Sequence, residues 1–158
     1  MQYVSVENQK TLDQAYRLTV IIVLAFCFTP VLLVVLGYFI GAKGGAIRAA
    51  ETYLLVTKVA YGGALIAGLA VVALRRFWLK FLHSGKRPVA AVLNNLRILA
   101  LLSAGLGEVV AIIGFIAYSL SGDYQFCWRL GGVGLLLILY GFPRRWEWER
   151  TLTHHAQA

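Results

Sequence analysis

The chain is poor in residues that bind metals or carry redox chemistry. It contains two cysteines and three histidines in 158 residues. Cys27 and Cys127 stand alone in the sequence, which excludes a disulfide framework and a CxxC metal or haem motif. No pair of histidines stands at ligand spacing inside an apolar segment. We therefore expect no metal site, no haem and no other cofactor.

Charged residues are also scarce. They make up 14% of the chain, whereas soluble domains have about 25%, and 59% of the residues are hydrophobic. No nucleophile–base pair accompanies the few acidic side chains, so we expect no catalytic residues and no enzyme activity. The polar first 17 residues lack the pattern of a signal peptide, and we expect the N-terminus to be retained.

The hydrophobic residues form four long blocks separated by polar segments. Three blocks are long enough to cross a bilayer as single helices. The fourth is strictly apolar only from Leu130 to Phe142, and it spans a membrane when its flanking residues lie at the two interfaces. The sequence therefore predicts an all-α integral membrane protein in which residues 1–158 form a single membrane domain, an antiparallel bundle of four transmembrane helices. The predicted spans are about residues 18–40, 53–74, 98–120 and 129–143.

Basic residues are distributed unevenly between the two sides of this predicted bundle. The tails, 1–17 and 144–158, and the central loop, 75–97, would share one side, which then carries eleven lysines and arginines, against three on the other. Because lysine and arginine collect on the cytoplasmic side, we expect both termini in the cytoplasm and the protein in the inner membrane. The net charge of +8 thus indicates contact with anionic lipid headgroups, not nucleic acid. The eleven residues are Lys10, Arg17, Arg75, Arg76, Lys80, Lys86, Arg87, Arg97, Arg144, Arg145 and Arg150.

The four tryptophans fall near the ends of the predicted spans, at positions 78, 128, 146 and 148. Tryptophan is enriched at membrane–water interfaces, so these side chains are expected to be interfacial anchors. The alternation of Trp146, Glu147, Trp148 and Glu149 near the C-terminus has the same interpretation. Docking of this segment on a cytoplasmic partner is the alternative.

Glu108 is the only aspartate, glutamate, lysine, arginine or histidine between Ile98 and Leu120, and it lies near the centre of that run. Ten residues separate it from Ile98, which places the carboxyl group roughly 15 Å deep, close to the bilayer midplane. A carboxylate at this depth is costly unless it is protonated, paired or facing water. Glu108 is thus a candidate proton- or ion-binding site, a protonated structural group, or half of an ion pair used in assembly. The residues beside it offer no oxygen ligands for sodium, which favours a proton.

Three side chains are the nearest candidate partners for this carboxyl group: Lys58, Ser103 and Tyr118. Apart from Arg129 at the very start of the fourth span, Lys58 is the only basic residue inside a predicted span, but its long side chain can also extend outward to the headgroups. Small residues recur at helical spacing in the second and third spans, as expected where membrane helices approach closely. We predict that these two spans pack as a tight antiparallel hairpin, or against other copies of the chain. The packing residues are Gly63, Ala67, Gly68, Gly107, Ala111 and Gly114.

The segment from Lys86 to Leu120, together with the second span from Tyr61 to Ala70, resembles the proteolipid (c) subunit of rotary ATP synthases. In that family a basic, proline-containing cytoplasmic loop leads into a helix with a midmembrane carboxylate and a later glycine. Lys86, Arg87 and Pro88 match the loop, Glu108 matches the carboxylate, and Gly114 matches the glycine. The resemblance implies reversible protonation of Glu108 within a ring of such hairpins. It covers about 60 residues, and the first and fourth spans have no counterpart in the family.

Three functions remain open from the sequence. The chain is either a proton-linked subunit of a membrane complex, or a non-catalytic accessory subunit that stabilises such a complex. A small proton-coupled transporter is the third. In the first two cases its partners are the lipid bilayer and other membrane subunits or copies of itself.

Overall fold

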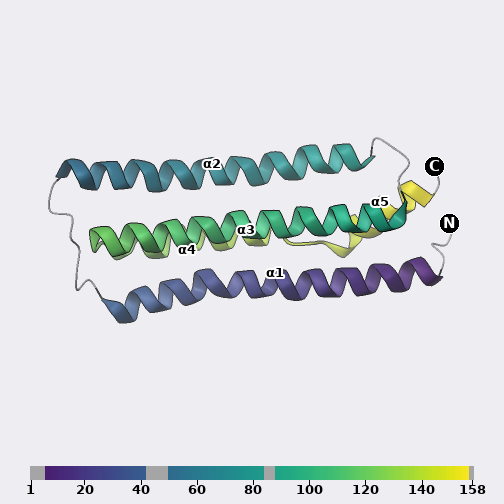
Figure 1. Ribbon diagram of the computed structural model, residues 1–158, viewed down its shortest axis with the longest axis horizontal. Coiled ribbons are helices and arrows are strands. Elements are labelled where there is room, and N and C mark those ends of the chain that lie inside the picture. Colours follow the sequence, from purple (N-terminus) through teal and green to yellow (C-terminus); the bar gives the residue numbers. More distant parts are fainter. Residues whose placement is uncertain (1–5, 42–49, 84–87, 157–158) are drawn as a thin grey trace.

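The computed structural model describes residues 6–41, 50–83 and 88–156, and these residues fold into five helices. Four long helices lie side by side, and a short fifth helix packs across one end (Figure 1). Both termini lie at that end of the bundle, which we call the terminal end. The helices are α1 (Val6–Ile40), α2 (Ala50–His83), α3 (Val89–Ser121), α4 (Tyr124–Tyr140) and α5 (Arg145–Ala156).

Successive long helices run in opposite directions, so α1 and α3 are parallel to each other and antiparallel to α2 and α4. The chain reverses tightly between α3 and α4. Gly122 adopts a left-handed conformation with φ of 73°, which a glycine accommodates without strain, and its N–H caps α3 by donating to the Tyr118 carbonyl. Asp123 then caps α4 by accepting a hydrogen bond from the N–H of Gln125. This turn forces α3 and α4 together along their length.

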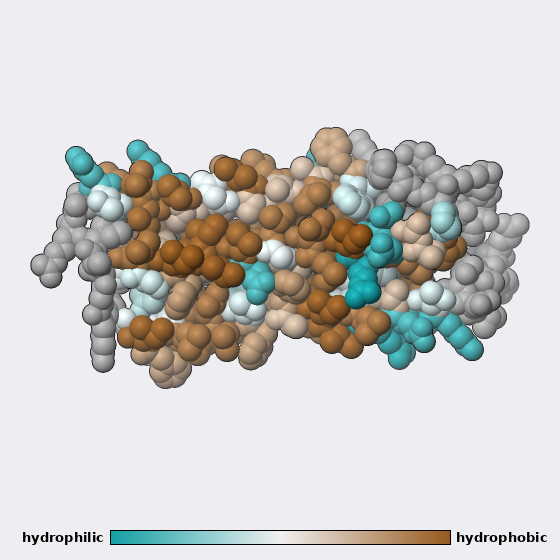
Figure 2. Space-filling view, in the orientation of Figure 1, coloured by the Kyte–Doolittle hydropathy of each residue, from teal (hydrophilic) through white to brown (hydrophobic). Residues whose placement is uncertain are grey.

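α3 is the central helix of the bundle, packed against α1, α2, α4 and α5. Of the most apolar stretch of α3, 44% of the residues are buried, against 17% in α1 and 22% in α2. Large aliphatic and aromatic side chains of α1 and α2 therefore point outward. Figure 2 shows hydrophobic residues over most of the middle of one face, with hydrophilic residues mainly towards the ends. Four helical segments are long and apolar enough to cross a membrane, as the sequence predicts.

The helices extend well beyond the predicted spans at the terminal end. The segment predicted as a central loop, 75–97, is helical as far as His83 and again from Val89. Of the two predicted tails, residues 6–17 belong to α1 and residues 145–156 form α5. These extensions are amphipathic, and they bury a second small core made of Leu12, Val92, Leu93, Leu96, Trp148 and Leu152. Hydropathy alone misses them because only one of their faces is apolar.

Candidate functional site

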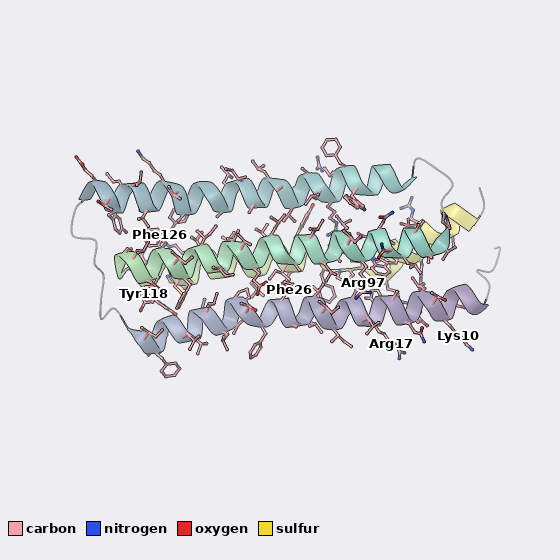
Figure 3. All side chains as sticks on the ribbon, viewed as in Figure 1. Lys10, Arg17, Phe26, Arg97, Tyr118 and Phe126 are labelled. Atoms are coloured by element: carbon pink, nitrogen blue, oxygen red, sulfur yellow. The ribbon has the colours of Figure 1, made fainter. Side chains whose placement is uncertain are left out.

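Glu108 lies in the middle of α3, half-buried, on the face that α3 turns towards α1. Leu101 and Ala104 precede it by seven and four residues and lie on the same helical stripe. Both belong to a hydrophobic cluster that includes Val23 and Phe26 of α1. Figure 3 shows Phe26 in the space between the two helices. These neighbours place Glu108 on the flank of α3 that borders α1, where its side chain is partly exposed.

Within the described part of the chain, Glu108 forms no ion pair and no hydrogen bond. Three carboxylates near the two ends of the bundle are engaged. Glu147 and Glu149 pair with arginines, and Asp123 accepts a hydrogen bond from Tyr53. Glu108 is therefore distinguished from these carboxylates both by its central position and by its lack of a partner among the described residues.

Lys58 is exposed on α2 and is not near Glu108. The next residue, Val59, lines an apolar groove together with Ile116 of α3. Lys58 is therefore close to the level of Ile116, eight residues from Glu108, or roughly 12 Å along the helix axis. The lysine also lies on the far side of α3 from α1. The structure does not bring this pair together within one chain.

Ser103 and Tyr118, the other two candidate partners, are also placed away from Glu108. The Tyr118 hydroxyl donates to the Gly37 carbonyl at 2.9 Å, near the end of the bundle opposite the termini. Ser103 is buried against Gly141, where α4 ends. Both side chains are thus committed to contacts that join α3 to its neighbours. Of Glu108 and its three candidate partners, only Glu108 lies at the centre of the bundle.

The small residues of α3 do mediate close packing, but against α4 and not against α2 as expected. A Cβ atom added to Gly107 would lie 2.7 Å from the Gly134 carbonyl oxygen, and one added to Gly114 would lie 2.6 Å from Cβ of Leu130. A Cβ added to Gly134 would lie 3.2 Å from Cβ of Ala111. The short turn after α3 explains this choice, because it holds α4 closest.

The small residues of α2 face larger side chains. A Cβ added to Gly63 would be 3.5 Å from Ile113, and one added to Gly68 would be 3.8 Å from Leu137. Ala67 is buried in the cluster that joins α2 to Val110 of α3. α2 therefore packs on α3 by ordinary side-chain contact, without the backbone approach seen between α3 and α4.

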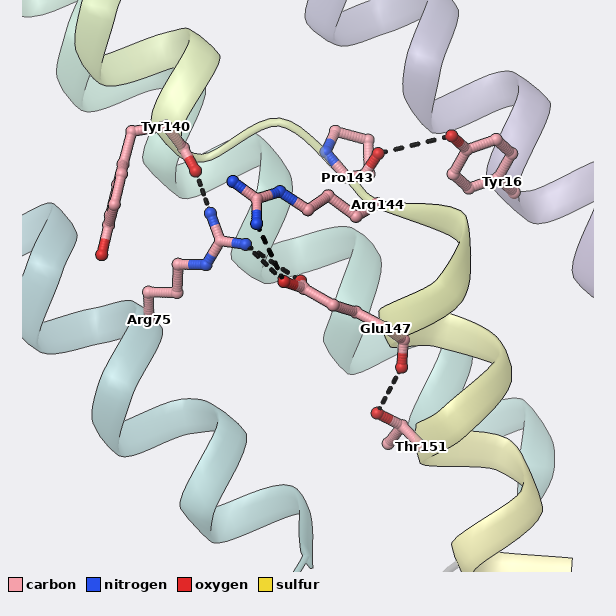
Figure 4. Close-up of polar contacts among 7 residues, drawn as sticks. All are labelled: Tyr16, Arg75, Tyr140, Pro143, Arg144, Glu147 and Thr151. Carbon is pink, nitrogen blue, oxygen red and sulfur yellow. Dashed lines mark hydrogen bonds and ion pairs between the residues drawn. The ribbon is translucent and has the colours of Figure 1, made fainter.

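A second polar cluster, which the sequence did not reveal, joins α2 to the elbow between α4 and α5 (Figure 4). The Arg75 guanidinium pairs with the Glu147 carboxylate at 2.7 Å, donates to the Tyr140 carbonyl, and stacks over the Tyr140 ring at 5.0 Å. The side chains of Arg75 and Glu147 are only 11% and 19% exposed. Arg144 adds a longer contact to Glu147 at 3.9 Å. In the sequence, the only feature that marks this region as charged is the pair of arginines after Pro143.

A small cavity of about 20 Å³ adjoins this cluster, lined by Arg75, Ser103 and Glu147 among others. Its volume is enough for about one water molecule. Ser103 thus belongs with the charged groups of the terminal end and not with Glu108.

Two of the four tryptophans differ from the expected interfacial role. Trp148 is 2% exposed and packs edge-on against Tyr16 with ring centroids 5.7 Å apart. The indole nitrogen of Trp78 is buried. Trp128 and Trp146 are exposed, at 51% and 56%. The alternating motif therefore works as an amphipathic helix, with Trp148 facing inward and Trp146 outward.

α5 is also tied to α1 by an exposed ion pair between Arg145 and Asp13, at 3.2 Å. The hydrogen bond from Arg145 to Glu149, reinforced by the charge of Asp13, raises the pKa of Arg145 above its usual value. Within residues 6–41, 50–83 and 88–156, no group of three histidine, cysteine or acidic side chains is placed to hold a metal ion.

No family model matches the chain, and neither a curated protein nor a solved structure with significant similarity was found.

Proposed function

We propose that the protein is a small multi-pass subunit of a larger complex in the inner membrane, with cytoplasmic termini and with Glu108 as its proton-binding group. The observation that carries this proposal is the position of Glu108, half-buried at the middle of the central helix without a partner in the described chain. In a bilayer this carboxyl group needs a proton, a water-filled path or a cation. No basic side chain pairs with it in the described residues, so a cation for this carboxyl group would come from a neighbouring chain.

The outer surface of the bundle supports its location in a membrane. α1 and α2 expose many large apolar side chains, including Phe28 at 67%, Phe39 at 78% and Ile66 at 69%. Lipid covers such side chains in a monomer, and neighbouring subunits cover them in a complex. The excess of basic residues at the terminal end supports the cytoplasmic orientation of that end. The resemblance to proteolipid subunits agrees with the location of the carboxylate.

The experiment that tests the proposal is labelling with dicyclohexylcarbodiimide, which attacks protonated carboxyl groups in apolar surroundings. Native membranes would be treated across a range of pH, and Glu108→Gln would serve as the control. We expect labelling of Glu108 that declines as the pH rises. Absence of labelling at every pH would contradict the proton-binding role. The accessory-subunit alternative would then account better for a chain whose terminal end is built from structural ion pairs.

The assembly itself is tested separately. Proximity cross-linking in membranes, followed by purification in a mild detergent, is expected to recover the chain in a species larger than a monomer. A strictly monomeric protein under both conditions would contradict the proposed complex, whatever the outcome of the labelling.

A further inference from the structure

Pro30 interrupts the hydrogen bonding of α1 (Val6–Ile40) ten residues before the helix ends. Proline has no backbone N–H, so the carbonyl of Phe26, four residues earlier, cannot receive its helical hydrogen bond. Pro30 is buried, and the Phe26 side chain packs in the hydrophobic cluster between α1 and α3. A carbonyl in such surroundings requires another donor, because water does not reach the centre of a bilayer.

Packing between α1 and α3 brings Glu108 to the level of this carbonyl. Phe26 of α1 and Ala104 of α3 belong to one hydrophobic cluster. The two helices run in the same direction, so one further turn along each brings Pro30 and Glu108 to the same level. A helical carbonyl points towards the residue four positions later, and the Phe26 carbonyl therefore points along α1 to that level.

Contacts through α4 give the same alignment independently. A Cβ added to Gly131 would lie 3.8 Å from the Pro30 carbonyl oxygen, and one added to Gly134 would lie 3.2 Å from Cβ of Ala111. Gly131 and Gly134 are three residues apart, less than one helical turn. Pro30 is therefore within about one turn of the level of Ala111, which follows Glu108 by three residues.

Few other polar side chains face this point in the described structure. On α1 they are Cys27 and the half-buried Thr29. On α3 the nearest charged residue on the same stripe is Arg97, three turns away, or roughly 16 Å. The α4 residues in contact with α3 here, Gly134 and Ile138, are not titratable. Glu108 is thus the strongest hydrogen-bond donor that the chain can bring to this carbonyl.

We infer that protonated Glu108 donates its carboxyl hydrogen to the main-chain carbonyl of Phe26, which Pro30 leaves without a helical donor. The inference rests on the proposed function in that Glu108 takes up a proton. The ionised carboxylate forms no such bond, because carboxylate and carbonyl are both acceptors. Proton uptake therefore links α3 to α1, and proton release breaks that link. Pro30 acts as a positioning residue for the site.

A double-mutant cycle tests the inference. Glu108→Gln keeps an N–H donor, whereas Glu108→Leu removes it. In the Pro30 background, at a pH where wild-type Glu108 is labelled by carbodiimide, we expect the leucine variant to unfold about 2–4 °C below the glutamine variant. In a Pro30→Ala background the restored N–H of residue 30 occupies the Phe26 carbonyl, and this difference should vanish. An equal difference in both backgrounds would overturn the inference. Thr29→Val is the matched control, because it changes the neighbouring residue without restoring an N–H.

Infrared spectroscopy keeps the inference testable if Pro30→Ala fails to fold. The chain has eight phenylalanines, and their carbonyls can be labelled with ¹³C. We expect one labelled carbonyl band to move to higher wavenumber in Glu108→Leu and to stay in place in Glu108→Gln. Unchanged bands in both would refute the hydrogen bond. One further outcome is a difference between Glu108→Leu and Glu108→Gln that is found only when Pro30 is present, while carbodiimide labelling shows no pH dependence. That combination would support the hydrogen bond and refute the proton-linked function.

Discussion

Gly107 lies where α3 and α4 approach each other closely. Its added Cβ would be 2.6 Å from Cγ1 of Ile138 and 2.7 Å from the Gly134 carbonyl, and the latter is backbone that cannot rotate away. We therefore expect Gly107→Ala to destabilise the protein by about 1–3 kcal/mol through overpacking. The measurement is thermal unfolding in detergent, followed by circular dichroism.

Gly105 supplies the matched control, because it lies two residues earlier on the same helix and an added Cβ there meets nothing within 4 Å. Alanine has the higher helix propensity, so Gly105→Ala should leave stability unchanged or raise it slightly. Equal losses from the two substitutions would show that the close approach to α4 is not what makes Gly107 sensitive.

Arg75 is the second residue whose environment makes a quantitative prediction. Replacing it with methionine keeps much of the packing but leaves the largely buried Glu147 carboxylate with only its longer contact to the exposed Arg144. We expect a loss of about 2 kcal/mol, typical of an unpaired buried polar group. Adding Glu147→Gln should recover part of this loss, since no unpaired charge then remains. The exposed Arg76→Met is the control. A loss no greater than that of the control would refute the role of the ion pair.

For a single residue, the sequence predicts its depth in the bilayer better than it predicts which side chains lie near it. The central position of Glu108 follows from counting residues along one helix, which needs only the helical rise. Its neighbours on other helices depend on which helix lies beside α3, and hydropathy carries no such information. The choice of Lys58, Ser103 and Tyr118 as candidate partners used depth alone. The interruption at Pro30 was visible in the sequence, but the alignment of α1 with α3 was not.

α5 is an amphipathic helix that packs on the bundle through one face only. Trp148 and Leu152 are each 2% exposed and close the core at the terminal end, whereas Trp146 on the opposite face is 56% exposed. We expect Trp148→Ala to cost about 3–5 kcal/mol, the range for large aromatic residues in cores. Trp146→Ala should change the free energy of unfolding much less.

The readout for this pair is the free energy of unfolding together with limited proteolysis, since a released α5 exposes its backbone to cleavage. Similar proteolysis of the two variants would mean that α5 is not docked in solution as it is in the structure.

The four long helices were predictable because apolar runs of this length have few other stable structures. Their ends were not, because the extensions at the terminal end bury only single faces. Leu12, for example, is 3% exposed, although the stretch from Gln9 to Arg17 around it is mostly polar. Hydropathy also does not predict the tight packing of α3 against α4. That packing depends on the turn at Gly122 and on the glycines through which the two helices face each other, such as Gly107 and Gly134.

For the whole molecule, the distribution of charge predicts the orientation in the membrane. In a chain with Cys27→Ala and Cys127→Ala, single cysteines can be placed at the exposed positions Lys10 and Gln125, at opposite ends of the bundle. We expect a membrane-impermeant maleimide to label Gln125→Cys in intact cells, and Lys10→Cys only after lysis. The reverse pattern would refute cytoplasmic termini, and labelling of both in intact cells would refute a fixed orientation.

The length of the helices also determines how far the protein stands from the lipid. α1 has 35 residues and α3 has 33, which correspond to roughly 50 Å, whereas the hydrocarbon layer is about 30 Å thick. In a bilayer, therefore, close to 20 Å of bundle lies outside the hydrocarbon. At the terminal end, the buried cluster around Trp148 packs the helix extensions together outside the hydrocarbon. The distance between the bilayer and any protein bound to α5 is then set by the length of these helices and not by a flexible linker.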